Sequence, residues 1–232
     1  MSEHIVKQFD ADLENIRSRV LQMGGLVEQQ IVKAVEGLTE GDLGLLEQTI
    51  ANDEQVNRQE VELDEACTNI IARRQPTAVD LRMVMMVVKT ITDLERIGDE
   101  AKKIAKKARA IHSAETHFVP RLEMRHVAGL AVEMLRKALD AFARLDLAAA
   151  AQVVRQDREV DAEFKGITRQ LITFMMEDPR TITRSLDLLF IAKSVERIGD
   201  HAKNISEYVV YMAKGRDVRH IGLAGIEKEI AG

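Results

Sequence analysis

The amino-acid sequence predicts an all-α protein built as two tandem three-helix bundles, which are related by an internal pseudo-twofold repeat. Three observations support this prediction. Only 3% of the 232 residues are aromatic and three are proline, so the core must consist of Leu, Ile, Val, Ala and Met, which favours helices over sheets. Apolar residues recur at spacings of three and four along six long segments. One short motif also occurs twice.

The six segments follow in order from the few residues that interrupt the apolar period. In the first segment, apolar residues recur from Ile16 to Val35 with the amphipathic helix period. Asp42 and Asp146 are natural N-cap residues for the second and fifth segments, and Thr77 with Asp80 has capping-box spacing for the third. We expect helices at 4–39, 43–74, 78–111, 121–144, 147–177 and 181–213.

The repeat is clearest in two ten-residue runs, ERIGDEAKKI at 95–104 and ERIGDHAKNI at 196–205. Eight of the ten positions are identical, at an offset of 101 residues. A weaker match at an offset of 104 relates earlier positions of the two halves, for example Asp53 and Asp157. We therefore expect one three-helix unit at 1–112 and a second at 120–214, with antiparallel neighbours. The tail at 215–232 has no clear period, and no element is predicted there.

Charge and cysteine content exclude several classes of protein. The net charge of −5 and pI near 5.8 lack the basic excess that is typical of nucleic-acid binding. Cys67 is the single cysteine, so the chain has no intrachain disulfide and no cysteine-based zinc site. No uncharged stretch exceeds eight residues and the N-terminus lacks a signal pattern. We expect a cytoplasmic protein that is peripheral to a membrane at most.

Carboxylates occur in pairs spaced by four residues, which places each pair on one face of a helix. Asn57 lies 19 residues before Pro76, and Glu95 lies 19 residues after it. In the second half the corresponding counts from Pro179 are 18 and 17. Because helices rise about 1.5 Å per residue, these pairs should face each other on adjacent antiparallel helices. The first expected cluster is Asp53, Asn57, Glu95 and Asp99, and the second is Asp157, Asp161, Glu196 and Asp200.

A cation would relieve the repulsion within such clusters, and oxygen ligands suit Mg²⁺, Mn²⁺ or Ca²⁺, or iron in a helical site. A solvated charged face is the alternative, because Lys103 follows Asp99 by four residues. The second cluster has four carboxylates, whereas the first has three and the amide of Asn57. We therefore expect the second cluster to bind a cation more tightly. His201 should point about 100° away from Asp200 and should not ligate the same ion.

Gly98 and Gly199 lie inside the carboxylate pairs, where a mid-helix glycine costs about 1 kcal/mol relative to alanine. Close packing of a neighbouring element, or access of a metal ion to the carboxylates, would each explain them. Gly24, Gly25 and Gly129 on the first helix of each unit invite the same close-packing explanation.

The duplicated ERIGD-x-AK-x-I motif, the run QPTAVDLR at 75–82 and the run EDPRTI at 177–182 resemble the PhoU family of phosphate-uptake regulators over residues 1 to about 214. The resemblance implies a homodimeric, cytoplasmic regulator of the high-affinity phosphate ABC transporter, acting through a membrane sensor kinase to repress the phosphate-starvation response. It also implies metal clusters on the E/D-x-x-x-D motifs, and Asn57 departs from that pattern.

The leading functional hypothesis is thus a non-catalytic adaptor that binds the transporter ATPase subunit and the sensor histidine kinase. The alternative is a carboxylate-bridged di-metal enzyme or metal store. Only one ExxH pair occurs, at Glu123 and His126, and no Gly-rich phosphate loop or Cys-His arrangement is present. The methionines near the proline turns are expected to fill the core or to form an adaptable binding surface; they are Met83, Met85, Met86, Met175 and Met176.

Overall fold

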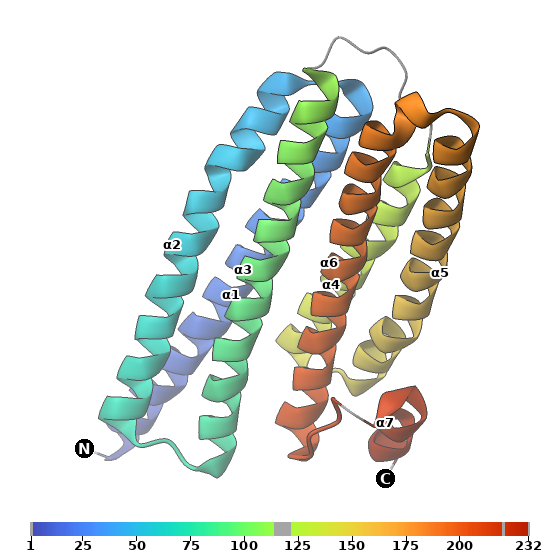
Figure 1. Cartoon of the computed structure of the whole chain (residues 1–232). Coiled ribbons are helices and arrows are strands. Elements are labelled where there is room, and N and C mark those ends of the chain that lie inside the picture. The colour runs from blue at the N-terminus through green and yellow to red at the C-terminus, as the bar shows by residue number, and fades with distance from the viewer. Residues whose placement is uncertain (1, 114–121, 220, 232) are drawn as a thin grey trace.

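A computed structural model describes residues 2–113, 122–219 and 221–231 (Figure 1). Its described residues form helices and connecting turns, with no strand. The helices are α1 (Ser2–Glu40), α2 (Leu43–Arg74), α3 (Ala78–His112), α4 (Met124–Arg144), α5 (Leu147–Glu177), the 3-10 turn η1 (Pro179–Thr181), α6 (Ile182–Lys214) and α7 (Gly222–Ala231). The all-α prediction and the six long helices are confirmed. The predicted start of the fourth helix, residue 121, lies outside the described residues.

The helix ends follow local side-chain chemistry. Asp42 Oδ1 accepts a hydrogen bond from the Leu45 amide at 2.9 Å, and Asp146 Oδ1 caps α5 in the same way. Thr77 differs from the prediction, because its hydroxyl donates to Asp80 Oδ2 at 3.0 Å and its side chain makes no cap hydrogen bond. Gly215 ends α6 with φ of +73°, a conformation that favours glycine.

The two three-helix units, α1–α3 and α4–α6, lie side by side with long helices roughly parallel to one another (Figure 1). Helix α3 packs along α6 and α1 packs on α4, so the units share an extensive interface. One continuous cluster of buried apolar side chains joins the two units, and it includes Ile97 of α3 and Ile198 of α6. The two ERIGD motifs therefore lie on the two central helices.

Helix α7 is an element that the sequence analysis did not predict. It is ten residues long and packs on α5 and α6. Its Ile226 side chain is fully buried, and Leu223 and Ile230 pack against the core. A helix this short is marginal in isolation, so its formation depends on this packing.

Close packing explains one of the three glycines on the first helix of each unit. A Cβ placed on Gly24 would lie only 2.5 Å from Leu139 Cδ1, which confirms the explanation where α1 meets α4. Gly25 and Gly129 have nothing within 4 Å of such a Cβ, so the explanation is wrong for them. In the described part of the chain, no helix combines the length and the apolar character needed to cross a bilayer.

Candidate functional site

The first carboxylate cluster lies where α2 faces α3. Asp53 of α2 is buried, with 1% of its surface exposed, and Glu95 and Asp99 of α3 are half-buried. Burial raises the pKa of Glu95, and the neighbouring carboxylates of Asp99, Glu60 and Asp53 raise it further. The three predicted acids therefore do lie together.

A lysine of α3 supplies the positive charge in this cluster. Lys102 Nζ donates a hydrogen bond to Asp53 Oδ2 at 2.6 Å, and this bond raises the pKa of Lys102. The predicted fourth member, Asn57, is exposed and its amide donates weakly to the same oxygen at 3.5 Å. The second oxygen of Asp53, Oδ1, is buried without a hydrogen-bond partner.

Glu60 is a member of the first cluster that the sequence analysis missed. Burial raises its pKa and the Asp64 carboxylate adds to the rise, whereas a hydrogen bond from Thr92 opposes it. The signal was available, since Glu60 and Thr92 lie 16 residues before and after Pro76. Their equal distance from the turn predicts the same height on adjacent helices.

The second cluster lies at the equivalent place between α5 and α6. Asp157 is buried, and Lys203 Nζ donates to its Oδ2 at 2.6 Å. Burial by the surrounding protein raises the pKa of Asp200, although this residue lies at the surface, and the carboxylates of Glu196 and Asp157 add to the rise. Glu196 itself accepts hydrogen bonds from Lys193 at 2.6 and 2.7 Å.

Asp161 is the second-cluster residue that the structure does not bring into contact with the others. It is half-buried and makes no hydrogen bond or ion pair with any described member of the cluster. The first cluster shows the same pattern at Asn57, one turn after the buried aspartate of α2. In both halves, the two helices are therefore joined mainly through the buried aspartate.

The duplicated element of the two sites is thus a buried aspartate bound to a lysine. Lys102 and Lys203 are related by the offset of 101, and Asp53 and Asp157 by the offset of 104. Both ion pairs have the same N–O distance of 2.6 Å. Lys103, which the solvated-face interpretation assigned to Asp99, instead pairs with Glu100 at 3.0 Å.

The glycines within the motifs differ in their surroundings. A Cβ on Gly98 would lie 3.1 Å from Gln30 Oε1 and 3.3 Å from Val56 Cγ1, so side chains pack tightly there. On Gly199 the nearest atom would be Val160 Cγ1 at 3.5 Å, an ordinary contact. Close packing therefore accounts for Gly98 and leaves Gly199 without a steric requirement.

A second polar network joins the two units. His201 Nδ1 lies 2.6 Å from Asp93 Oδ1, and both side chains are buried between α6 and α3. Asn204 donates to the same oxygen at 3.3 Å, while His201 Nε2 has no hydrogen-bond partner. His201 therefore faces α3, as its place on the helix predicted, and the network fixes the orientation of α3 relative to α6.

The residues do not fit a metal cluster in this arrangement. Carboxylates suit a hard cation, and the partnerless Asp53 Oδ1 is an available oxygen. However, among the described residues no three His, Cys, Asp or Glu side chains converge on a point that could hold an ion. The ammonium groups of Lys102 and Lys203 instead bind the two buried carboxylates.

Comparison with known proteins relates both halves of the chain to one family. The model of the PhoU domain matches residues 20–108 and 124–209. A Pseudomonas aeruginosa protein named phosphate-specific transport system accessory protein PhoU homolog is 48% identical, covering 99% of this chain and 95% of its own length. The Escherichia coli phosphate-specific transport system accessory protein PhoU is 47% identical, covering 100% and 96%. The crystal structure of PhoU from Pseudomonas aeruginosa superposes with a TM-score of 0.86 at 47% identity, covering 90% of this chain and 100% of that one.

Proposed function

The chain belongs to the PhoU family, and from this premise we propose that it is a non-catalytic regulator of phosphate uptake. The observation that carries the proposal is the match to named accessory proteins of phosphate-specific transport systems over almost the full length of both partners. The match extends through both three-helix units, so it includes both ERIGD motifs.

In this proposal the protein is a cytoplasmic adaptor, peripheral to the membrane. It binds the ATPase subunit of the phosphate ABC transporter and the sensor histidine kinase of the starvation response, and it represses that response when phosphate is sufficient. We further propose that it acts as a homodimer. The end of α5 and the start of α6 offer a suitable contact surface, because exposed apolar side chains gather there; they are Ile172, Met176, Ile182, Leu186 and Phe190.

The experiment is a deletion of the gene in its host, with a starvation-inducible phosphatase measured in phosphate-rich medium. We expect the phosphatase to become constitutive, and a plasmid copy of the gene to restore repression. If the phosphatase stays repressed in the deletion strain, the adaptor proposal is wrong for this protein.

The alternative function, a carboxylate-bridged di-metal enzyme or metal store, makes a different prediction. Such a protein would turn over a phosphate compound in purified form, and the activity would persist in extracts that lack the transporter ATPase. The two ion pairs of Lys102 with Asp53 and Lys203 with Asp157 favour the non-catalytic role, since they engage the most buried carboxylate of each cluster.

Metal binding at the two clusters stays a separate prediction. It requires Lys102 and Lys203 to move away from the buried aspartates, so that Mg²⁺, Mn²⁺ or iron can take their place. Metal analysis after dialysis against a weak chelator tests it, with Asp200→Asn expected to lose more metal than Asp99→Asn. A larger loss from Asp99→Asn would reverse the expected ranking, and metal-free wild type would reject metal binding.

A further inference from the structure

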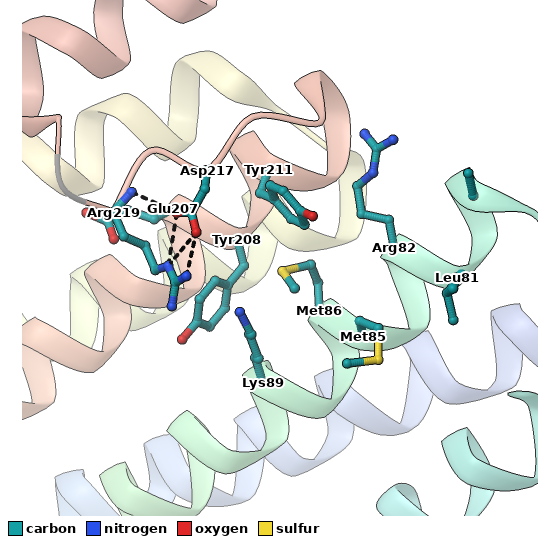
Figure 2. Close-up of a pocket in the computed structure, with 11 residues that line it drawn as sticks. Leu81, Arg82, Met85, Met86, Lys89, Glu207, Tyr208, Tyr211, Asp217 and Arg219 are labelled. Carbon is teal, nitrogen blue, oxygen red and sulfur yellow. Dashed lines mark hydrogen bonds and ion pairs between the residues drawn. The ribbon is translucent and has the colours of Figure 1, made fainter.

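A cavity of about 530 Å³ lies where the first turns of α3 meet the last turns of α6 and the segment that follows α6 (Figure 2). Helix α3 belongs to the first unit and α6 to the second, so the two units build the cavity together. Its volume lies within the range of small-molecule sites, about 300–1,000 Å³. It is separate from the two ion-paired aspartates described above.

Two cations of α3 line this cavity, and each lies over a tyrosine ring of α6. The Arg82 guanidinium carbon is 5.7 Å from the centre of the Tyr211 ring, and Lys89 Nζ is 5.6 Å from that of Tyr208. Among the described residues, neither cation has a carboxylate within ion-pair distance. Cation–π contacts hold the two groups in place without neutralising them.

The repeat supplies an internal comparison for this arrangement. The position equivalent to Lys89 is Phe190, and the position equivalent to Tyr208 is Lys107, so the cation and the ring are exchanged. Lys107 Nζ lies 5.0 Å from the centre of the Phe190 ring. There, however, Asp187 neutralises Lys107 at 2.8 Å.

The first unit lacks this neutralising group. The residue equivalent to Asp187 is Met86, a thioether that carries no charge. A cation–π brace between α3 and α6 is therefore common to both ends of the interface, whereas the unneutralised cations occur only at the cavity. A purely structural role would not explain why this end leaves two positive charges unpaired.

The other lining residues define what a ligand must look like. Arg219 is already paired with Asp217 through its Nε at 2.9 Å, which leaves Arg82 and Lys89 as the unpaired cations. Figure 2 shows Met86 between these two cations on α3, with Met85 and Leu81 beside it. Met85 is 43% exposed, so the cavity offers an apolar and adaptable wall.

We propose that this cavity binds an organic polyphosphate of about nucleotide size. Arg82 and Lys89 are seven residues apart, which is about 10 Å along a helix. A chain of phosphates can reach both cations, and Arg and Lys are the residues that bind phosphate groups. The methionine wall accepts the apolar part of the ligand, and the volume exceeds what one inorganic phosphate ion would fill.

Isothermal titration calorimetry of the full-length protein with four probes tests the class of ligand. The probes are ATP without magnesium, AMP, adenosine and inorganic phosphate. We expect saturable binding of ATP, at least tenfold weaker binding of AMP and of inorganic phosphate, and no binding of adenosine. Absence of saturable ATP binding overturns the proposal, and so does binding of adenosine or inorganic phosphate with the affinity of ATP.

Substitutions then locate the site. Arg82→Ala and Lys89→Ala should each weaken ATP binding about tenfold, because each removes a charge-assisted contact. The matched control is Lys107→Ala, which removes the equivalent cation–π lysine outside the cavity and should change the affinity by less than about twofold. Equal weakening by all three variants overturns the proposed location.

A measurement on the unmodified protein covers the case in which these variants fail to fold. In a sample with ¹³C-labelled methionine methyl groups, ATP should shift the resonances of Met85 and Met86, which line the cavity. Met176 on α5 is the internal control, since it is 80% exposed and lies outside the cavity. Saturable ATP binding without shifts of Met85 and Met86 rejects this site.

Discussion

Replacing Lys102 by methionine should destabilise the protein through the carboxylate that it leaves behind. The substitution keeps the length of the apolar stem and removes only the ammonium group. That group donates to Asp53 Oδ2 at 2.6 Å, and Asp53 is 1% exposed. Because the second oxygen of Asp53 already lacks a partner, the variant retains a buried negative charge without compensation.

The size of the effect follows from the burial of the two partners. Removing one member of a buried ion pair costs about 3–5 kcal/mol. The Lys102 side chain is 28% exposed, so water can partly replace it, and we expect the lower end, about 3 kcal/mol. In a chain of this length, about 3 kcal/mol corresponds to a fall in Tm of about 6–12 °C.

A double substitution separates the charge effect from lost packing. Lys102→Met combined with Asp53→Asn removes both charges, and its unfolding free energy should return to within about 1 kcal/mol of wild type. Lys203→Met should cost less than Lys102→Met, because Asp157 is 7% exposed rather than 1%. Lys106→Met is the control, since Lys106 is exposed and should change stability by about 0.5 kcal/mol or less.

The assay is urea unfolding at pH 7, followed by the helical circular dichroism signal. The reasoning is refuted if Lys102→Met unfolds within about 1 kcal/mol of wild type. It is also refuted if the double variant is as unstable as the single one, because loss of packing rather than an unpaired charge would then explain the effect.

Three further predictions concern other buried positions. Gly199→Ala should raise the unfolding free energy by up to about 1 kcal/mol, whereas Gly98→Ala should give no gain because its Cβ would lie 3.1 Å from a glutamine oxygen; parallel thermal melts compare them. Burial raises the pKa of Glu207 to about 7, above its unfolded value, so stability should fall as the pH rises from about 4.5 to 7. Glu207→Gln should therefore be more stable than wild type at pH 8 by about 1–2 kcal/mol, after allowance for solvent screening, but not at pH 4; equal differences at both pH values would contradict this. Burial also raises the pKa of the Cys67 thiol to about 12, so a thiol reagent at pH 8 should label Cys67 only as fast as the protein unfolds; rapid labelling of native protein would show that the site opens locally.

The sequence by itself determined the helices, their caps and the duplication. These features depend on the period along one segment and on side chains within about four residues of each other, as at Asp42 and Asp146. Counting residues from Pro76 also placed Glu95 near Asp53, because two helices that leave a tight turn rise at the same rate. Helix α7 escaped prediction because its ten residues carry too short a pattern and form only by packing.

Only the tertiary structure decided which partner each buried charge has. Lys102 follows Asp99 by three residues on the same helix, yet its ammonium group binds Asp53 on α2. His201 likewise pairs with Asp93, 108 residues away, and the cavity beside Lys89 and Tyr208 needs helices from both units. The spacing along a helix fixes which face a side chain occupies, but the rotation and axial shift between packed helices decide what that face meets, and these depend on the whole core.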